Sequence, residues 1–109
     1  MNKLIRLTLF TVFSILISFQ TVQAVEVTFR VDMSEETVSP LGVHIAGSFQ
    51  GWDPGATEMT LTQNNIYVYT ADLTVGEEIE YKFVNGNAWG MDEQVPAGCA
   101  QNGNRFLTV

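Results

Sequence analysis

A strict alternation of apolar and polar side chains over residues 25–33 constrains the fold of this chain more than any other feature. Successive side chains of a β-strand point to opposite faces, so a period of two indicates a strand with one face buried. No segment after Ala24 shows the period of an amphipathic helix. The apolar positions of the stretch are Val25, Val27, Phe29, Val31 and Met33. The sequence therefore predicts an all-β domain.

Shorter runs of β-branched and aromatic residues follow, separated by turn residues. Asn64 and Asn65 stand between two of these runs and tolerate the positive φ angles of a tight hairpin turn. Two more turns are expected at residues 75–77 and 85–87. The further strands are expected at residues 43–46, 59–62, 66–73, 79–84 and 105–109. Elements of this length and spacing predict an antiparallel β-sandwich of about seven short strands.

The strand expected at residues 79–84 gives its two faces different roles. Ile79, Tyr81 and Phe83 share one face, which we expect to lie in the core. Lys82 points the other way, where a solvated lysine is the ordinary case. It becomes a binding residue only if that outer face also holds the chemistry described below.

The N-terminus has the charged, apolar and cleavage-site regions of a secretory signal peptide. Lys3 and Arg6 precede an apolar run from Leu7 to Phe19, and the segment ends at Ala24 with small residues at positions 22 and 24. The alternative is a transmembrane anchor, but the apolar run of about 13 residues is shorter than the roughly 20 that a span requires. We therefore expect a signal peptide at residues 1–24, a single mature domain at residues 25–109, and a secreted or periplasmic protein.

The mature domain is strongly acidic. It keeps three basic residues against twelve carboxylates, a formal net charge of −9. Such a surface repels phosphate backbones and anionic lipids, which argues against nucleic-acid and membrane partners. It suits a neutral or cationic partner.

Two tryptophans, Trp52 and Trp89, lie in loop-like stretches rich in glycine and amide residues. The apolar face of a sugar ring stacks on an indole, and its hydroxyl groups require donors and acceptors nearby. The alternative is that either indole fills the core. Phe49 precedes Trp52 by three residues, so one of these two rings is a candidate for burial in place of the other.

No residue set predicts catalysis or metal binding. His44 and Cys99 are the only histidine and cysteine, too few for a zinc site, and no cofactor motif is present. Asp53, Asp92 and Glu93 imitate a hydrolase carboxylate pair, but accidental pairs are common in so acidic a chain. For Cys99 we expect burial or a packed loop rather than a bond between chains.

Two stretches resemble glycogen- and starch-binding modules. "VHIAGSFQGWDPGATEM" is similar to their GSF-x-x-W stretch, and "YKFVNGNAWGMDE" to their YKF-x-x-[DN]G-x-W-x-x-D stretch. The ending "GNRFLTV" resembles their last strand, and the opening "VTFRVDMS" resembles secreted bacterial relatives. The nearest types are the glycogen-binding domain of AMP-activated kinase β subunits and carbohydrate-binding modules of families 20 and 48. The resemblance covers nearly all of residues 25–109, and its specificity comes from the two motifs occurring together.

The resemblance implies an immunoglobulin-like sandwich that holds α-1,4-glucan on a shallow face. In that reading Trp52 and Trp89 stack on glucose rings, Lys82 donates to sugar hydroxyls, and Asn104 and Asn102 form polar contacts at the rim. The loop at residues 90–103 departs from the family pattern, which leaves the ligand preference open. We thus expect a non-catalytic module that binds starch, glycogen or maltooligosaccharides beside a glucan-active enzyme or further domains of a longer chain. The alternative is a structural or protein-interaction module of the same fold that binds no sugar.

Overall fold

The computed structural model describes residues 11–18 and 21–109. The predicted signal peptide falls partly on residues 1–10 and 19–20, which lie outside the described residues. Residues 11–18 form neither helix nor strand, and their side chains are exposed. Within the described residues, no helix is long and apolar enough to cross a membrane.

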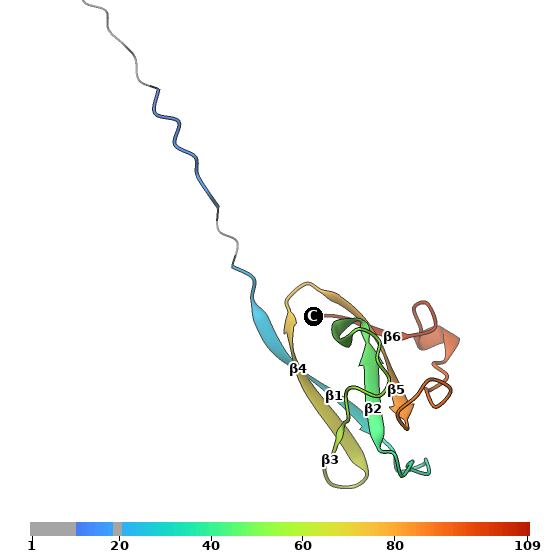
Figure 1. Cartoon of the computed structure of the whole chain (residues 1–109). Helices are drawn as coiled ribbons and strands as arrows, with labels where there is room; N and C mark the ends of the chain where they lie inside the picture. The colour runs from blue at the N-terminus through green and yellow to red at the C-terminus, as the bar shows by residue number, and fades with distance from the viewer. Residues whose placement is uncertain (1–10, 19–20) are drawn as a thin grey trace, which may run out of the picture.

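The described part of the chain forms six strands in two antiparallel three-stranded sheets (Figure 1). One sheet has the order β1-β4-β3 and the other the order β2-β5-β6. The bounds are β1 Ala24–Asp32, β2 Val43–Gly47, β3 Thr60–Leu61, β4 Ile66–Thr74, β5 Glu78–Asn85 and β6 Arg105–Thr108. Two short 3-10 helices are η1 Ser48–Gln50 and η2 Ala97–Cys99. This confirms the predicted all-β class, and the two-sheet arrangement fits an immunoglobulin-like sandwich.

The core lies between the sheets and contains the side chains that the alternation assigns to it. Phe29 of β1 and Phe83 of β5 are buried, while the polar positions of β1 are exposed. Phe29 bridges the sheets, with its ring 5.2 Å from the Phe49 ring of η1 and 4.8 Å from the Tyr81 ring of β5. Phe49 is therefore the ring that packs on the core, which leaves the nearby Trp52 outside it.

The tight hairpin between β3 and β4 turns at the predicted residues. Asn64 and Asn65 have φ angles of 61° and 59°, which asparagine accepts more readily than most residues. The strands on either side pair with Thr60 opposite Val68. Turn chemistry read from the sequence thus sets the register of this hairpin.

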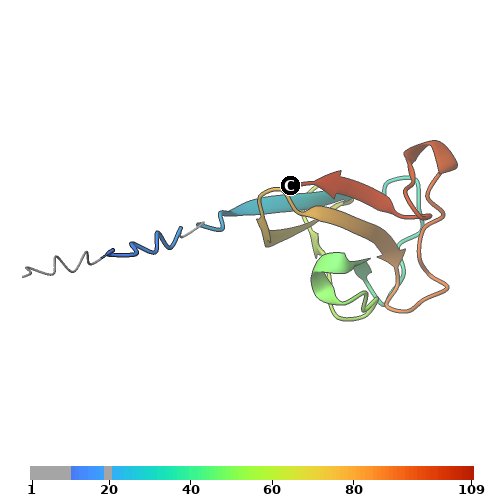
Figure 2. The same cartoon turned by 90° about the horizontal axis from the view of Figure 1, so that it is seen from above.

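The long connection between β5 and β6 leaves the sandwich at the end opposite the start of β1 (Figure 2). It first runs back along β5, because Asn85 donates its N–H to the Met91 carbonyl and Glu93 donates to the Phe83 carbonyl. Residues 57–59 likewise pair with the outer edge of β2, through the Ile45 N–H and the Val43 carbonyl. The outer edge of β2 and the second half of β5 thus pair with chain that also belongs to the loops of the candidate site.

Candidate functional site

The two tryptophans come together at the surface. Their ring centroids lie 6.4 Å apart and their planes are inclined by 39°. Trp89 is 50% exposed, and Trp52 is partly exposed. The structure therefore brings two distant parts of the sequence into one aromatic patch, formed by Trp52 and Trp89 and called here the indole pair.

A single glutamine side chain shapes the loop that carries Trp52. The Gln50 amide oxygen accepts the N–H groups of Gly47 and Asp53, and its NH2 group donates to the Asp53 carbonyl and the Thr57 hydroxyl. The backbone between these anchors is left-handed at Gly51 and at Trp52, where φ is 57°. A bulky residue rarely adopts this conformation, so the loop holds Trp52 at a cost in backbone strain.

The loop that carries Trp89 is fixed by a glycine and by its neighbour loop. Gly86 has a φ of 138°, and a Cβ at this position would collide with the Met91 thioether. A Cβ added to Gly55, in the Trp52 loop, would lie only 2.9 Å from the Asn87 carbonyl oxygen. The two tryptophan loops therefore pack against each other, and glycines permit the close approach.

The outer face of the β2-β5-β6 sheet is partly covered rather than open to solvent. Val84 and Ala46 point away from the core by strand alternation, yet both are 0% exposed. His44, opposite Val84, is also buried, and its Nδ1 lacks a hydrogen-bond partner among the described residues. These three side chains are buried outside the main core cluster, and His44 is therefore an interior residue of β2 rather than a surface group.

Lys82 emerges on this outer face beside the Trp89 loop. Its Nζ lies 2.9 Å from Asp92 Oδ2, and the two side chains are only 18% and 16% exposed. Asp92 Oδ1 also accepts the N–H of Gly90, the residue after Trp89. The hydrogen bond from Lys82 holds the pKa of Asp92 below its ordinary value, while burial opposes this shift. Asp92 thus ties the lysine to the turn that presents the indole.

The free energy of unfolding is expected to fall in acid partly through Asp92. Because its folded-state pKa is lowered, its stabilising effect is complete above about pH 4 and is lost as the pH falls through the folded-state value. Denaturant melts from neutral to strongly acidic pH measure this loss. Asp92→Asn retains an acceptor but cannot titrate, so its profile should be flatter than the parent's below about pH 4. Parallel profiles would contradict this role.

The two asparagines of the predicted rim meet at one carboxylate. Glu80 Oε1 accepts from Asn102 Nδ2 at 3.2 Å and from Asn104 Nδ2 at 3.5 Å. Glu80 lies two residues before Lys82 in β5, on the same face. The predicted site residues therefore lie along one side of the second sheet, with Glu80 and Asp92 as the anionic partners that sequence reasoning did not assign.

Cys99 corrects one expectation. The sequence predicts burial or a packed loop for this residue, but Cys99 lies at the end of η2 and is exposed. The connection that carries it projects from the sandwich (Figure 2). The exposure of Cys99 could not be predicted from the apolar character of cysteine, because the burial of a loop residue depends on the path of the loop.

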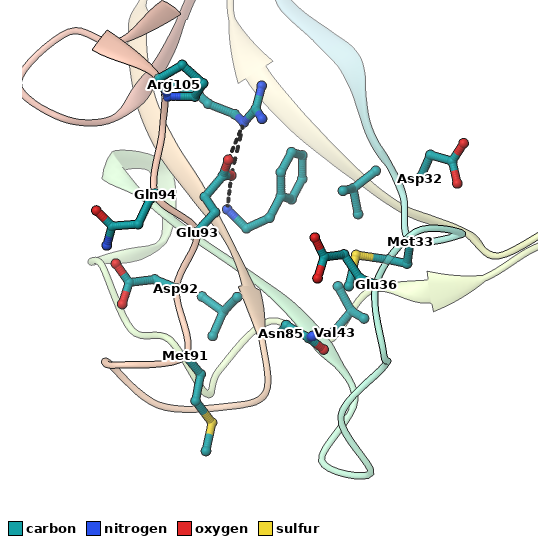
Figure 3. A pocket seen from close by; sticks show the side chains of 14 residues that line it. Asp32, Met33, Glu36, Val43, Asn85, Met91, Asp92, Glu93, Gln94 and Arg105 are labelled. Atoms are coloured by element: carbon teal, nitrogen blue, oxygen red, sulfur yellow. Dashed lines mark hydrogen bonds and ion pairs between the residues drawn. The ribbon is translucent and has the colours of Figure 1, made fainter.

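A cavity of about 640 Å³ opens between the end of β1 and residues 91–96, and its lining includes neither tryptophan (Figure 3). Glu93 crosses it, accepting the Arg105 Nε–H at 2.8 Å and the Phe83 N–H at 2.8 Å. Asp32 and Glu36 line the opposite wall, and Phe83 also lines the cavity. The carboxylates Asp92 and Glu93, which imitated a catalytic pair in the sequence, are thus each held in an ion pair.

Known starch-active enzymes are similar to this chain. An amylopullulanase of Thermoanaerobacterium thermosulfurigenes is 37% identical over 87 residues, which are 78% of this chain and 4% of that enzyme. An amylopullulanase of Thermoanaerobacter thermohydrosulfuricus is 38% identical over 87 residues, 78% of this chain and 6% of the enzyme. An alpha-amylase of Niallia circulans is 35% identical over 88 residues, 79% of this chain and 7% of the enzyme.

No family model matches the chain, and no solved structure matches it significantly. The chain spans only 4 to 7% of the length of the three relatives. Its likeness is therefore to one small segment of each large enzyme, and that segment corresponds to most of this chain.

Proposed function

We propose that the domain is a non-catalytic module that binds α-1,4-linked glucan, such as starch, glycogen or maltooligosaccharides. The observation that carries the proposal is the indole pair, an exposed aromatic patch built by two loops that fix each other. Indole faces stack on the apolar faces of pyranose rings, and neighbouring polar groups bind the hydroxyls. No cofactor enters this function.

The inclination of the two indoles favours an α-linked chain. Consecutive glucose rings in an α-1,4-glucan are turned relative to one another, so that the chain curves. The 39° angle between the Trp52 and Trp89 rings offers such a chain two platforms of different orientation. A flat β-linked chain would require platforms that are nearly coplanar.

The polar partners of the sugar come from the same side of the sheet. Lys82 supplies an ammonium whose position is fixed by Asp92, which leaves further N–H donors on Nζ for hydroxyl oxygens. Asn102 and Asn104 each donate from the NH2 group to Glu80, which leaves their amide oxygens as acceptors for sugar hydroxyls. Contacts of this kind are individually weak, and we expect dissociation constants from about ten micromolar to millimolar.

The relatives support a role beside catalysis rather than in it. This chain resembles a small segment of enzymes named for starch hydrolysis, and the carboxylates that imitate a catalytic pair are engaged in ion pairs. We infer that the module holds glucan for a glucan-active enzyme or for further domains of a longer chain. The proposed leader at residues 1–24 would place the mature domain, residues 25–109, outside the cytoplasm, where polymeric starch occurs.

Each of Trp52→Ala and Trp89→Ala is expected to weaken maltoheptaose binding by about 1 kcal/mol or more, roughly fivefold in Kd. Both rings lie outside the main core, so the free energy of unfolding should change far less than the binding energy of the sugar. Isothermal titration of each variant, after its folding is checked by amide dispersion, measures the effect. Phe29→Leu in the core is a matched control, since it lowers stability without touching the indole pair.

Two results would reject this function. If both folded tryptophan variants bind maltoheptaose like the parent, the indole pair is not the sugar site. If the parent binds no α-glucan, a protein-interaction module of the same fold takes its place.

A further inference from the structure

A third exposed aromatic ring shares the outer face with the predicted site. Phe106 of β6 is 51% exposed and stands opposite Glu80 of β5. Paired residues in a sheet point to the same side, so Phe106, Glu80 and Lys82 all face outward. The sequence predicts that Phe106 lies in the closing strand at residues 105–109 and assigns it no role.

A hollow of about 210 Å³ lies beside this ring. Ser48 of η1 borders it on the side of the Trp52 loop, and Gln101 borders it from the long connection. Residues of β5 and β6 complete the lining: Glu78, Ile79, Glu80, Phe106, Leu107 and Thr108. An aromatic wall with carboxylate, amide and hydroxyl groups around it has the composition that a single sugar ring requires.

The hollow adjoins the rim of the predicted site rather than forming a separate one. Glu80 belongs both to the hollow and to the cluster that it forms with Asn102 and Asn104. Both asparagine side chains donate their hydrogen bonds to Oε1 of Glu80, which leaves Oε2 as an acceptor for a ligand. Lys82 and Phe106 are separated by two residues along one strand and by one strand spacing, roughly 8 Å between Cα atoms.

We propose that Phe106 and this hollow form a distal subsite for glucan chains too long to be held by the indole pair alone. The chain runs from Trp52 and Trp89 past Lys82 and the two asparagines, and a further glucose ring stacks on Phe106 while Glu80 accepts from its hydroxyls. The inference rests on the proposed function, and it makes the module selective for chain length.

Titration with two ligands tests the subsite. The parent should bind maltoheptaose more tightly than maltotriose. Phe106→Ala should weaken maltoheptaose binding about fivefold, as expected for loss of one aromatic platform, and leave maltotriose binding unchanged. Phe106→Tyr, which keeps the ring, should restore the parent's affinity for the longer sugar.

A matched control separates the subsite from general loss of surface. Leu61 of β3, in the other sheet, is 52% exposed, so Leu61→Ala removes comparable exposed apolar surface and should alter neither affinity. If Phe106→Ala binds both sugars like the parent, or weakens both equally, the distal subsite is rejected while the indole pair stands. If the parent binds neither sugar, the proposed function fails first, and the subsite fails with it.

Discussion

Phe83→Ala is expected to lower the free energy of unfolding by about 3 to 5 kcal/mol, the usual cost of truncating a buried aromatic residue. Phe83 is 9% exposed, and its ring lies 5.7 Å from that of Tyr81 in an edge-to-face arrangement. The Arg105 guanidinium also lies over the ring, with its carbon 5.5 Å from the centroid. Chemical denaturation monitored by tryptophan fluorescence measures the loss.

The adjacent residue provides the control for this prediction. Lys82 points to the opposite face, so Lys82→Ala opens no cavity in the main core. It removes the ion pair with Asp92 and should cost at most about 2 kcal/mol, because Asp92 keeps the Gly90 N–H as a partner. Equal losses for the two variants would mean that the strand faces differ from those described.

Glu93→Ala is expected to destabilise the domain by about 2 to 3 kcal/mol, a large effect for a loop residue. Its carboxylate replaces the carbonyl acceptor of a neighbouring strand, because the Phe83 backbone N–H donates to Glu93 Oε2 at 2.8 Å. It also pairs with Arg105. Removing the carboxylate leaves the part-buried Phe83 N–H without an acceptor and the Arg105 guanidinium without its counter-ion.

Two further variants distinguish these contributions. Glu93→Gln keeps an acceptor for the Phe83 N–H and should recover about half of the loss. Combining Glu93→Ala with Arg105→Ala in a double-mutant cycle gives the coupling energy between the two side chains. Denaturant melts in which Glu93→Ala is as stable as the parent would show that water satisfies the freed groups.

The strands could be predicted because each carries its own signal. Alternation in residues 25–33 and in residues 79–84 predicts which face of each strand packs on the core, and β1 and β5 bury the predicted faces. Asn64 and Asn65 report a turn through their tolerance of positive φ. What alternation cannot predict is burial on the outer face: it puts Val84 on the same side as Lys82, yet Val84 is 0% exposed.

The candidate site could be predicted only in part, for a related reason. The residue types around Trp52 and Trp89 indicated loops that favour sugar binding, but no local pattern states that two loops meet. That contact depends on Gly55 approaching the Asn87 carbonyl. Glu80, Asp92 and Gln50 were missed because a polar residue that positions another has the same sequence signature as a solvated one.

The left-handed backbone at Trp52 has a consequence for attempts to improve the domain. Glycine accepts a φ of 57° without strain, so Trp52→Gly should relieve roughly 1 kcal/mol of backbone strain. The lost packing of the Trp52 ring on Trp89 offsets this gain, and the variant lacks one platform of the proposed sugar site. Selection for heat resistance alone would therefore tolerate the loss of Trp52, whereas under the proposed function selection on insoluble starch would retain it. A library of variants at position 52, screened separately for thermal stability and for starch binding, would show whether the two properties favour different residues there.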